Sequence, residues 1–285
     1  MQLIFSLLFI VASFVGSFLL AGGPIKALLQ PFEVMMLGGS AIGFLFASNT
    51  IPAIKKIGKY MKYLMKKPYD EEKFSQLSGL LFALAKQKSE DPIELNNHLI
   101  NPESSAIFSK YPLVQADVDA VNFISNNFLL YVDNGNQFTA FNFEEYLEIE
   151  IEEYSHEAHG PYKVVAALVD TMPALGICAA VLGIILSMGY LDAPMEELGA
   201  HIGAALFGTF FGVFLAYGLF KPISLKFMKF ADESVSFMKV SQAYLVSLMK
   251  GYDPLVASII TNKSVPPRYR MPDHELKQKL MKGEL

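Results

Sequence analysis

Hydrophobic and polar residues follow one another along this chain in long blocks rather than in short alternations. Four blocks are almost free of charge: residues 3–20, the 21 residues between Glu33 and Lys55, the 21 between Asp170 and Asp192, and the segment between Glu197 and Lys221. About 20 mostly apolar residues are enough for a helix to cross a bilayer. The pattern therefore predicts a polytopic membrane protein with four transmembrane helices.

The first block could instead be a secretory signal peptide. Such a peptide begins with a basic region and ends at a small-residue cleavage site. Here no Lys or Arg precedes Lys26, and the uncharged run continues through Ala21 to Pro24. We therefore expect the first block to remain in the protein as a transmembrane helix.

Basic residues are distributed unevenly between the segments that join the four blocks. Segment 51–167 carries 11 Lys and the residues from 224 onward carry 10 Lys and Arg, whereas loops 21–32 and 192–200 carry one Lys and none. Cytoplasmic segments of membrane proteins carry the excess of Lys and Arg. Both termini and the long middle segment are therefore predicted to be cytoplasmic.

The polar segments have helical rather than strand-like periodicity. Residues 70–89 carry an apolar stripe, residues 137–158 form an acidic pattern that is either a solvated face or a docking surface, and the period of the fourth block continues to Gly251. We predict an all-α fold in four divisions. They are transmembrane helices 1 and 2 in 1–52, a large helical cytoplasmic domain in 53–167, transmembrane helices 3 and 4 in 168–223, and a helical extension with a loose tail in 224–285.

Composition and side-chain chemistry exclude several classes of function. A net charge of −5 argues against binding of nucleic acid. His156 and His159 are three residues apart, whereas a zinc-protease helix needs a spacing of four. Because no nucleophile–base pair or metal set accompanies Cys178, we predict no enzyme, cofactor or metal. A membrane-bound enzyme and a purely structural scaffold remain the alternatives from other classes.

The third and fourth blocks carry small residues at regular intervals. Ala204, Gly208 and Gly212 recur every four residues, and Gly176 begins a shorter series. Small residues let another membrane helix approach closely, either within one chain or between several. Thr209 is the one hydroxyl deep in the fourth block; it either bonds to its own helix or faces an ion path.

Two prolines stand near the cytoplasmic ends of the last two blocks. Pro173 opens the third block and Pro222 closes the fourth, and proline can kink or hinge a helix. No Asp, Glu, Lys or Arg lies near the middle of any block. Ion-coupled membrane proteins normally place an ionisable group there. If ions cross with the help of this chain, another subunit must supply the carboxylate.

Four motifs occur in a fixed order along residues 10–254. They are Gln30-Pro31-x-Glu33 with Gly39-x3-Gly43, Asn101-Pro102-Glu103-Ser104 with Tyr111-Pro112, Asp170-x2-Pro173-Ala174-x-Gly176, and Gly208-Thr209-Phe210-x-Gly212 with Pro222. Together they resemble the flagellar stator subunits of the MotA/TolQ/ExbB proton-channel family. The resemblance implies a homo-oligomer, a pentameric ring, around two MotB chains in the bacterial inner membrane. MotB would supply the membrane Asp and a peptidoglycan anchor.

The same resemblance implies roles for individual residues. Pro173 and Pro222 match prolines that couple ion flow to movement, and Thr209 and Ala180 match positions that line the ion path. Sodium-driven relatives tend to have Thr where this chain has Ala180, and alanine has no oxygen to replace the water of a sodium ion. The resemblance therefore favours protons.

The residues expected to contact the rotor protein FliG match the family's pattern less closely. The family's basic position falls on Lys88, and its acidic position falls on Asn96, which is neutral. Glu94 could take its place, although two residues along a helix rotate a side chain by about 200°. The alternative within the family is an ExbB/TolQ-like motor that energises a cell-envelope process. Those chains have three spans, whereas here two spans precede the cytoplasmic domain.

Overall fold

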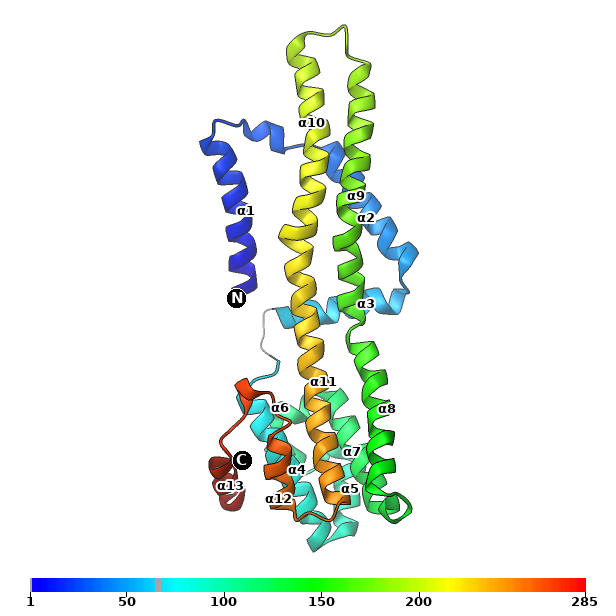
Figure 1. Ribbon diagram of the computed structural model, residues 1–285, viewed down its shortest axis with the longest axis vertical. Helices are drawn as coiled ribbons and strands as arrows, with labels where there is room; N and C mark the ends of the chain where they lie inside the picture. The colour runs from blue at the N-terminus through cyan, green and yellow to red at the C-terminus, as the bar shows by residue number, and fades with distance from the viewer. Residues whose placement is uncertain (1, 65–67) are drawn as a thin grey trace. The chain divides into compact units, whose positions relative to one another are not determined.

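The computed structural model describes residues 2–64 and 68–285 and shows helices as the only regular elements among them (Figure 1). The chain divides into two compact units. Met1–Lys67 with His159–Lys229 form one, here called the membrane unit, and Pro68–Ala158 with Phe230–Leu285 form the other, here called the polar unit. The all-α prediction is confirmed.

The membrane unit contains all the apolar blocks. Its elements are α1 (Gln2–Leu20), the 3-10 turns η1 (Ile25–Leu28) and η2 (Lys62–Leu64), α2 (Pro31–Ser48), α3 (Ile51–Met61), α9 (Gly160–Met188), α10 (Met195–Val213), the π-helical segment η6 (Phe214–Phe220) and the start of α11 (Lys221–Met249). By length and apolar composition, four helical stretches can cross a membrane: Gln2–Leu20, Ile25–Ser48, Gly160–Met188 and Met195–Met249. The prediction of four transmembrane helices is confirmed.

The second apolar block is divided between two helices. α2 ends at Ser48, and Asn49 has an extended backbone before α3 begins at Ile51. Pro52 favours the break, because it has no amide to donate to the carbonyl of Ser48 and is tolerated in the first turn of a new helix. α2 therefore ends before the uncharged run in the sequence does.

Pro173 does not open a helix, which corrects the sequence-based expectation. α9 begins at Gly160, so Pro173 lies inside it. A count of uncharged residues starts only after Asp170, but Asp170 and Lys163 are exposed and Val164, Val165 and Leu168 are buried in the same helix. α9 therefore begins with an amphipathic segment that precedes its apolar part.

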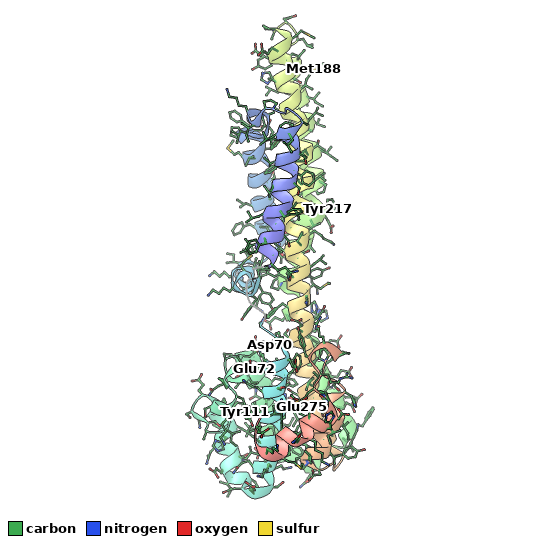
Figure 2. The ribbon with its side chains drawn as sticks, turned by 90° about the vertical axis from the view of Figure 1, so that its left-hand side faces the viewer. Asp70, Glu72, Tyr111, Met188, Tyr217 and Glu275 are labelled. Atoms are coloured by element: carbon green, nitrogen blue, oxygen red, sulfur yellow. The ribbon has the colours of Figure 1, made fainter. Side chains whose placement is uncertain are left out.

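The helical backbone of the fourth block continues from Met195 to Met249. Pro222 lies in the first turn of α11, directly after η6, where the amide of Lys221 donates to the carbonyl of Ala216 five residues back. Tyr217 marks this wider turn in Figure 2. Gly251 ends the run with a φ of +84°, a left-handed conformation that glycine adopts without strain. The predicted continuation to Gly251 is confirmed.

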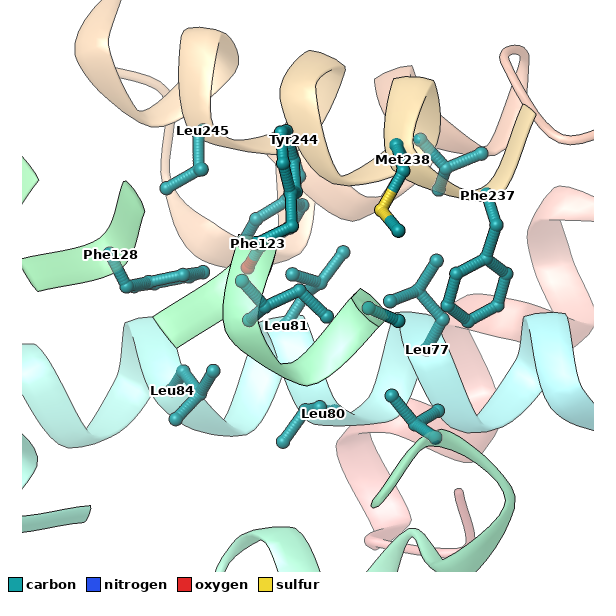
Figure 3. Packing of buried hydrophobic residues seen from close by; sticks show 14 of the residues in the cluster. Leu77, Leu80, Leu81, Leu84, Phe123, Phe128, Phe237, Met238, Tyr244 and Leu245 are labelled. Atoms are coloured by element: carbon teal, nitrogen blue, oxygen red, sulfur yellow. The ribbon is translucent and has the colours of Figure 1, made fainter. Parts of the chain in front are cut away.

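The polar unit is built around α4 (Glu71–Glu90). Leu77, Leu80, Leu81 and Leu84, all fully or almost fully buried, form the stripe expected from the sequence. Figure 3 shows them packed with aromatic and aliphatic side chains of other helices. Those helices are α5 (Pro92–Ile100), α6 (Pro112–Gln115), α7 (Val118–Asn134), α8 (Ala140–Ala158) and the later part of α11, with short turns η3 (Pro102–Ser104), η4 (Phe108–Lys110) and η5 (Gly135–Gln137).

The C-terminal segment is folded, contrary to the expectation of a loose tail. It forms α12 (Pro254–Asn262), the turn η7 (Pro267–Tyr269) and α13 (Asp273–Lys282). Leu276 is 1% exposed, and the buried carboxylate of Glu233 accepts hydrogen bonds from Arg268 at 2.7 Å and from the hydroxyl of Tyr269 at 2.9 Å. Burial, and then the bond to Glu233, raise the pKa of the Tyr269 hydroxyl. The segment is polar in composition, but a few well-spaced apolar residues such as Leu276 are enough to anchor it.

Candidate functional site

Glycines bring the backbones of α9 and α10 into direct contact. A Cβ atom on Gly212 would lie 2.8 Å from the Cα of Gly176 and 2.8 Å from the carbonyl oxygen of Met172. A Cβ on Gly176 would lie 3.0 Å from the carbonyl oxygen of Gly208. Small residues thus serve helix packing inside one chain here. Ala204 is half-buried on α10, one turn before Gly208.

The two expected ion-path residues lie at the level of this glycine contact. Ala180 on α9 is 7% exposed, and its amide nitrogen is 3.4 Å from the Cβ position of Gly208. Thr209 on α10 is half-buried, and its carbonyl oxygen is 3.4 Å from the Cβ position of Gly176. Residues far apart in sequence therefore flank one point on the α9–α10 pair. This helix pair forms the candidate site.

The sequence left two roles open for Thr209, and the first of them, a bond from its hydroxyl to its own helix, is not formed. No hydrogen bond joins that hydroxyl to another residue in the part of the chain that the structure describes, whereas Thr171 on α9 does donate to the carbonyl of Ala167 at 2.8 Å. The hydroxyl of Thr209 can therefore still donate one hydrogen bond and accept others.

Pro173 and Pro222 lie on the two helical runs that form the site. Pro173 precedes Gly176 by less than one turn of α9, next to Met172, whose carbonyl faces Gly212. Pro222 follows the π-helical segment that continues α10. Each proline interrupts the backbone hydrogen-bond pattern of a helix that continues beyond it. Along the chain, one of these interruptions in helical hydrogen bonding precedes the glycine contact and the other follows it.

Sequence reasoning did not single out Glu33 as a site residue. It lies in the first turn of α2, and one of its carboxylate oxygens is buried without a hydrogen-bond partner among the described residues. Burying such a group unpaired is costly. The signal that could have pointed to Glu33 was its place as an acidic residue at the edge of an apolar block. Within the described ranges, no cluster of three or more His, Cys, Asp or Glu side chains is placed to hold a metal ion.

The expected rotor-facing residues lie where α4 meets α5, but they face different surroundings. The ammonium group of Lys88 lies 3.5 Å above the ring of Tyr131, and the amide of Asn96 donates to Asp133 at 3.2 Å, so both turn toward α7. Glu94 is exposed and accepts a hydrogen bond from Gln87 at 3.1 Å. Of the two charged residues, Glu94 presents its charge more openly than Lys88.

Comparison with known proteins identifies the family. A model described as the N-terminal region of motility protein A matches residues 4–91, and one for the MotA/TolQ/ExbB proton channel family matches residues 121–239. Motility protein A of Salmonella typhimurium is 33% identical over 259 residues, which cover 90% of this chain and 87% of that protein. The chain belongs to the MotA/TolQ/ExbB proton channel family.

Other members of the MotA/TolQ/ExbB family agree in sequence and in fold. Motility protein A of Escherichia coli is also 33% identical over 90% of this chain, and the chemotaxis protein LafT of Vibrio parahaemolyticus is 31% identical over 90%. The structure of C. jejuni MotAB superposes with a TM-score of 0.71 at 20% identity, covering 93% of this chain and 96% of that one. The flagellar MotAB stator complex of Bacillus subtilis gives 0.70, at 20% identity and with 95% and 98% covered. The fold is that of MotA.

Proposed function

We infer that this chain is the MotA-type subunit of a flagellar stator, which couples proton flow across the membrane to torque on the rotor. The observation that carries this inference is the match to motility protein A over 90% of the chain, with the glycine contact and both prolines inside the matched length. The four membrane-spanning helices place the subunit in the membrane. In this function the chain transforms no covalent substrate.

The ion path forms together with a MotB partner. The described part of the α9–α10 contact offers a threonine hydroxyl and small residues, so the proton-carrying carboxylate comes from a membrane helix of MotB. The hydroxyl of Thr209 forms a hydrogen bond close to that carboxylate. Ala180 faces the path, and its side chain has no oxygen that could bind a sodium ion. The structure of a relative containing MotB supports the choice of partner.

Movement follows from the change of charge on the partner's carboxylate. A charged group at a membrane interface is costly, so protonation and deprotonation favour different packings of the helices around it. Pro173 and Pro222 are the hinges, because each lies where a helix lacks one backbone hydrogen bond. A π-helical segment, often found at functional sites, precedes Pro222.

The polar unit transmits this movement to FliG. The protein lies in the inner membrane, with both termini and the polar unit on the cytoplasmic side. Copies of the chain form a pentameric ring around MotB, as the family resemblance implies. Glu94 is the most exposed of the three expected contact residues, with Lys88 and Asn96 held against α7 beside it. An ExbB/TolQ-like role in energising the cell envelope is the alternative. Two spans before the polar unit and relatives named motility protein A favour the flagellar role.

Deleting the gene in a strain without other stator genes should leave cells that carry flagella but do not swim in soft agar. The wild-type gene should restore swimming, and Pro173→Ala should not, because it refills the missing backbone hydrogen bond of the hinge. Pro194→Ala, at the exposed residue before α10, is the matched control and should restore swimming. Normal swimming of the deletion strain would instead favour the cell-envelope role.

Glu94→Gln should slow swimming without lowering the amount of protein in the membrane. Glu94 is 59% exposed at its side chain, and exposed ion pairs contribute only about 0–1 kcal/mol, so the loss should be partial. Swimming speed and immunoblots of membranes measure the two effects. Glu103→Gln, another exposed carboxylate of the polar unit, is the control. Equal speeds for the two variants would remove Glu94 from the rotor contact.

A further inference from the structure

An apolar cavity of about 610 Å³ lies between α1, η1 and α10 of the membrane unit. Twelve residues line it, six of them Phe, and none has a polar atom in its side chain. Figure 1 shows η1 connecting α1 to the next helix beside α10. Apolar cavities of this kind do not favour ordered water. This one is partly open, so in a bilayer it suits an apolar group from its surroundings.

α1 touches the rest of the unit mainly at one side of this cavity. The ring of Phe14 lies 6.0 Å from that of Phe210 and 5.2 Å from that of Phe214, measured between centroids. Leu3 is the only buried residue of α1. Because few side chains of this chain close the gap, whatever fills the cavity also determines how firmly α1 is held.

The size of the cavity decides between the possible occupants. A membrane-crossing helix about 10 Å across and 30 Å long occupies roughly 2,400 Å³. That is well above the volume of the cavity, so a helix from another chain could lie across its mouth but could not enter it whole. Pockets of roughly 300–1,000 Å³ suit small ligands. In a membrane the abundant apolar ligand of that size is the acyl chain of a lipid.

A basic residue lies in the turn that lines part of the cavity. Lys26 is exposed in the same 3-10 turn as Ala27 and Leu28, which line the cavity. It is the single basic residue of loop 21–32. We propose that a phospholipid binds here, with an acyl chain between α1 and α10 and its phosphate group paired with the ammonium group of Lys26. The lipid completes the packing of α1, and this role is separate from the ion path on α9 and α10.

Filling the cavity tests the proposal. A Cβ atom at Gly203, which lines the cavity, meets no atom within 4 Å, so Gly203→Leu can occupy the space without a clash at its base. Gly199→Leu adds the same side chain one turn earlier on α10, outside the cavity and equally free of contacts. The full complex is reconstituted in nanodiscs of phosphatidylglycerol and phosphatidylethanolamine, extracted into detergent, and examined by native mass spectrometry.

Wild type and Gly199→Leu should each retain one phospholipid per chain, and Gly203→Leu should retain at least about tenfold less. Lys26→Gln should lower the retention of phosphatidylglycerol relative to wild type even if Gly203→Leu fails to fold. Equal retention by Gly203→Leu and Gly199→Leu would overturn the proposal. So would a photo-crosslinking side chain at Phe207 that labels a second copy of the chain or its partner rather than lipid.

Discussion

Lys73→Ala is expected to destabilise the polar unit by about 3–5 kcal/mol, the usual cost of leaving one member of a buried ion pair alone. The ammonium group of Lys73 on α4 lies 2.6 Å from a carboxylate oxygen of Asp117, and the two side chains are 7% and 15% exposed. The hydroxyl of Tyr69 donates to the same oxygen at 2.9 Å. Removing the lysine leaves a largely buried carboxylate with no positive charge beside it and only neutral donors, the hydroxyl of Tyr69 and the amide of Ala120.

Asp117 also begins α7, since its other carboxylate oxygen accepts a hydrogen bond from the amide of Ala120 at 3.3 Å. The loss of Lys73 should therefore loosen α4 and α7 together. Amide hydrogen exchange of the full-length protein measures this as faster exchange in the peptides that cover both helices.

Lys86→Ala is the matched control on the same helix. Lys86 pairs with Glu90 at 3.6 Å, and the two side chains are 64% and 60% exposed. Such surface pairs contribute about 0–1 kcal/mol, so exchange in α7 should not change. If Lys73→Ala and Lys86→Ala gave the same exchange, the buried pair would not hold the two helices together.

Gly212→Ala is expected to disrupt the candidate site strongly, although it adds only one methyl group. The added Cβ would lie 2.8 Å from atoms of the α9 backbone on two sides, and backbone cannot rotate away as a flexible side chain can. Overpacking of this kind costs about 1–3 kcal/mol. α9 and α10 should separate, and swimming in soft agar should be lost.

The apparent Tm of the detergent-purified protein measures the effect, at about 2–4 °C per kcal/mol for a chain of this order of size. Gly199→Ala is the control, because its Cβ meets no atom within 4 Å on the same helix. Both changes gain the same helix propensity, close to 1 kcal/mol over glycine. A Tm as high in Gly212→Ala as in Gly199→Ala would show that the two helices tolerate separation at this point.

Local patterns predicted much of this fold because they depend on neighbours within a few turns. The apolar stripe of Leu77, Leu80, Leu81 and Leu84 is legible from helical periodicity alone. Gly251 is legible as a helix end for the same reason, since glycine adopts the left-handed conformation at low cost. Errors arose where a short-range signal was overridden, as at Pro173, which is accommodated inside α9.

The candidate site was only partly predictable. The sequence indicated that Gly176, Gly208 and Gly212 pack closely, but not that they meet each other within one chain. That Lys88 and Asn96 turn toward Tyr131 and Asp133 depends on how α5 lies against α7. Residues so distant along the chain share no local pattern.

The order of residues along the chain was enough to predict the four membrane-spanning helices, the helical class and, through its ordered motifs, the family. Transfer of a segment into a bilayer depends on the summed hydrophobicity of adjacent residues, which a sequence states directly. Only the folded chain shows which faces of those helices meet, that residues 254–285 fold, and that a cavity remains beside α1. These features depend on contacts between distant residues, whose shapes and charges must fit together in space.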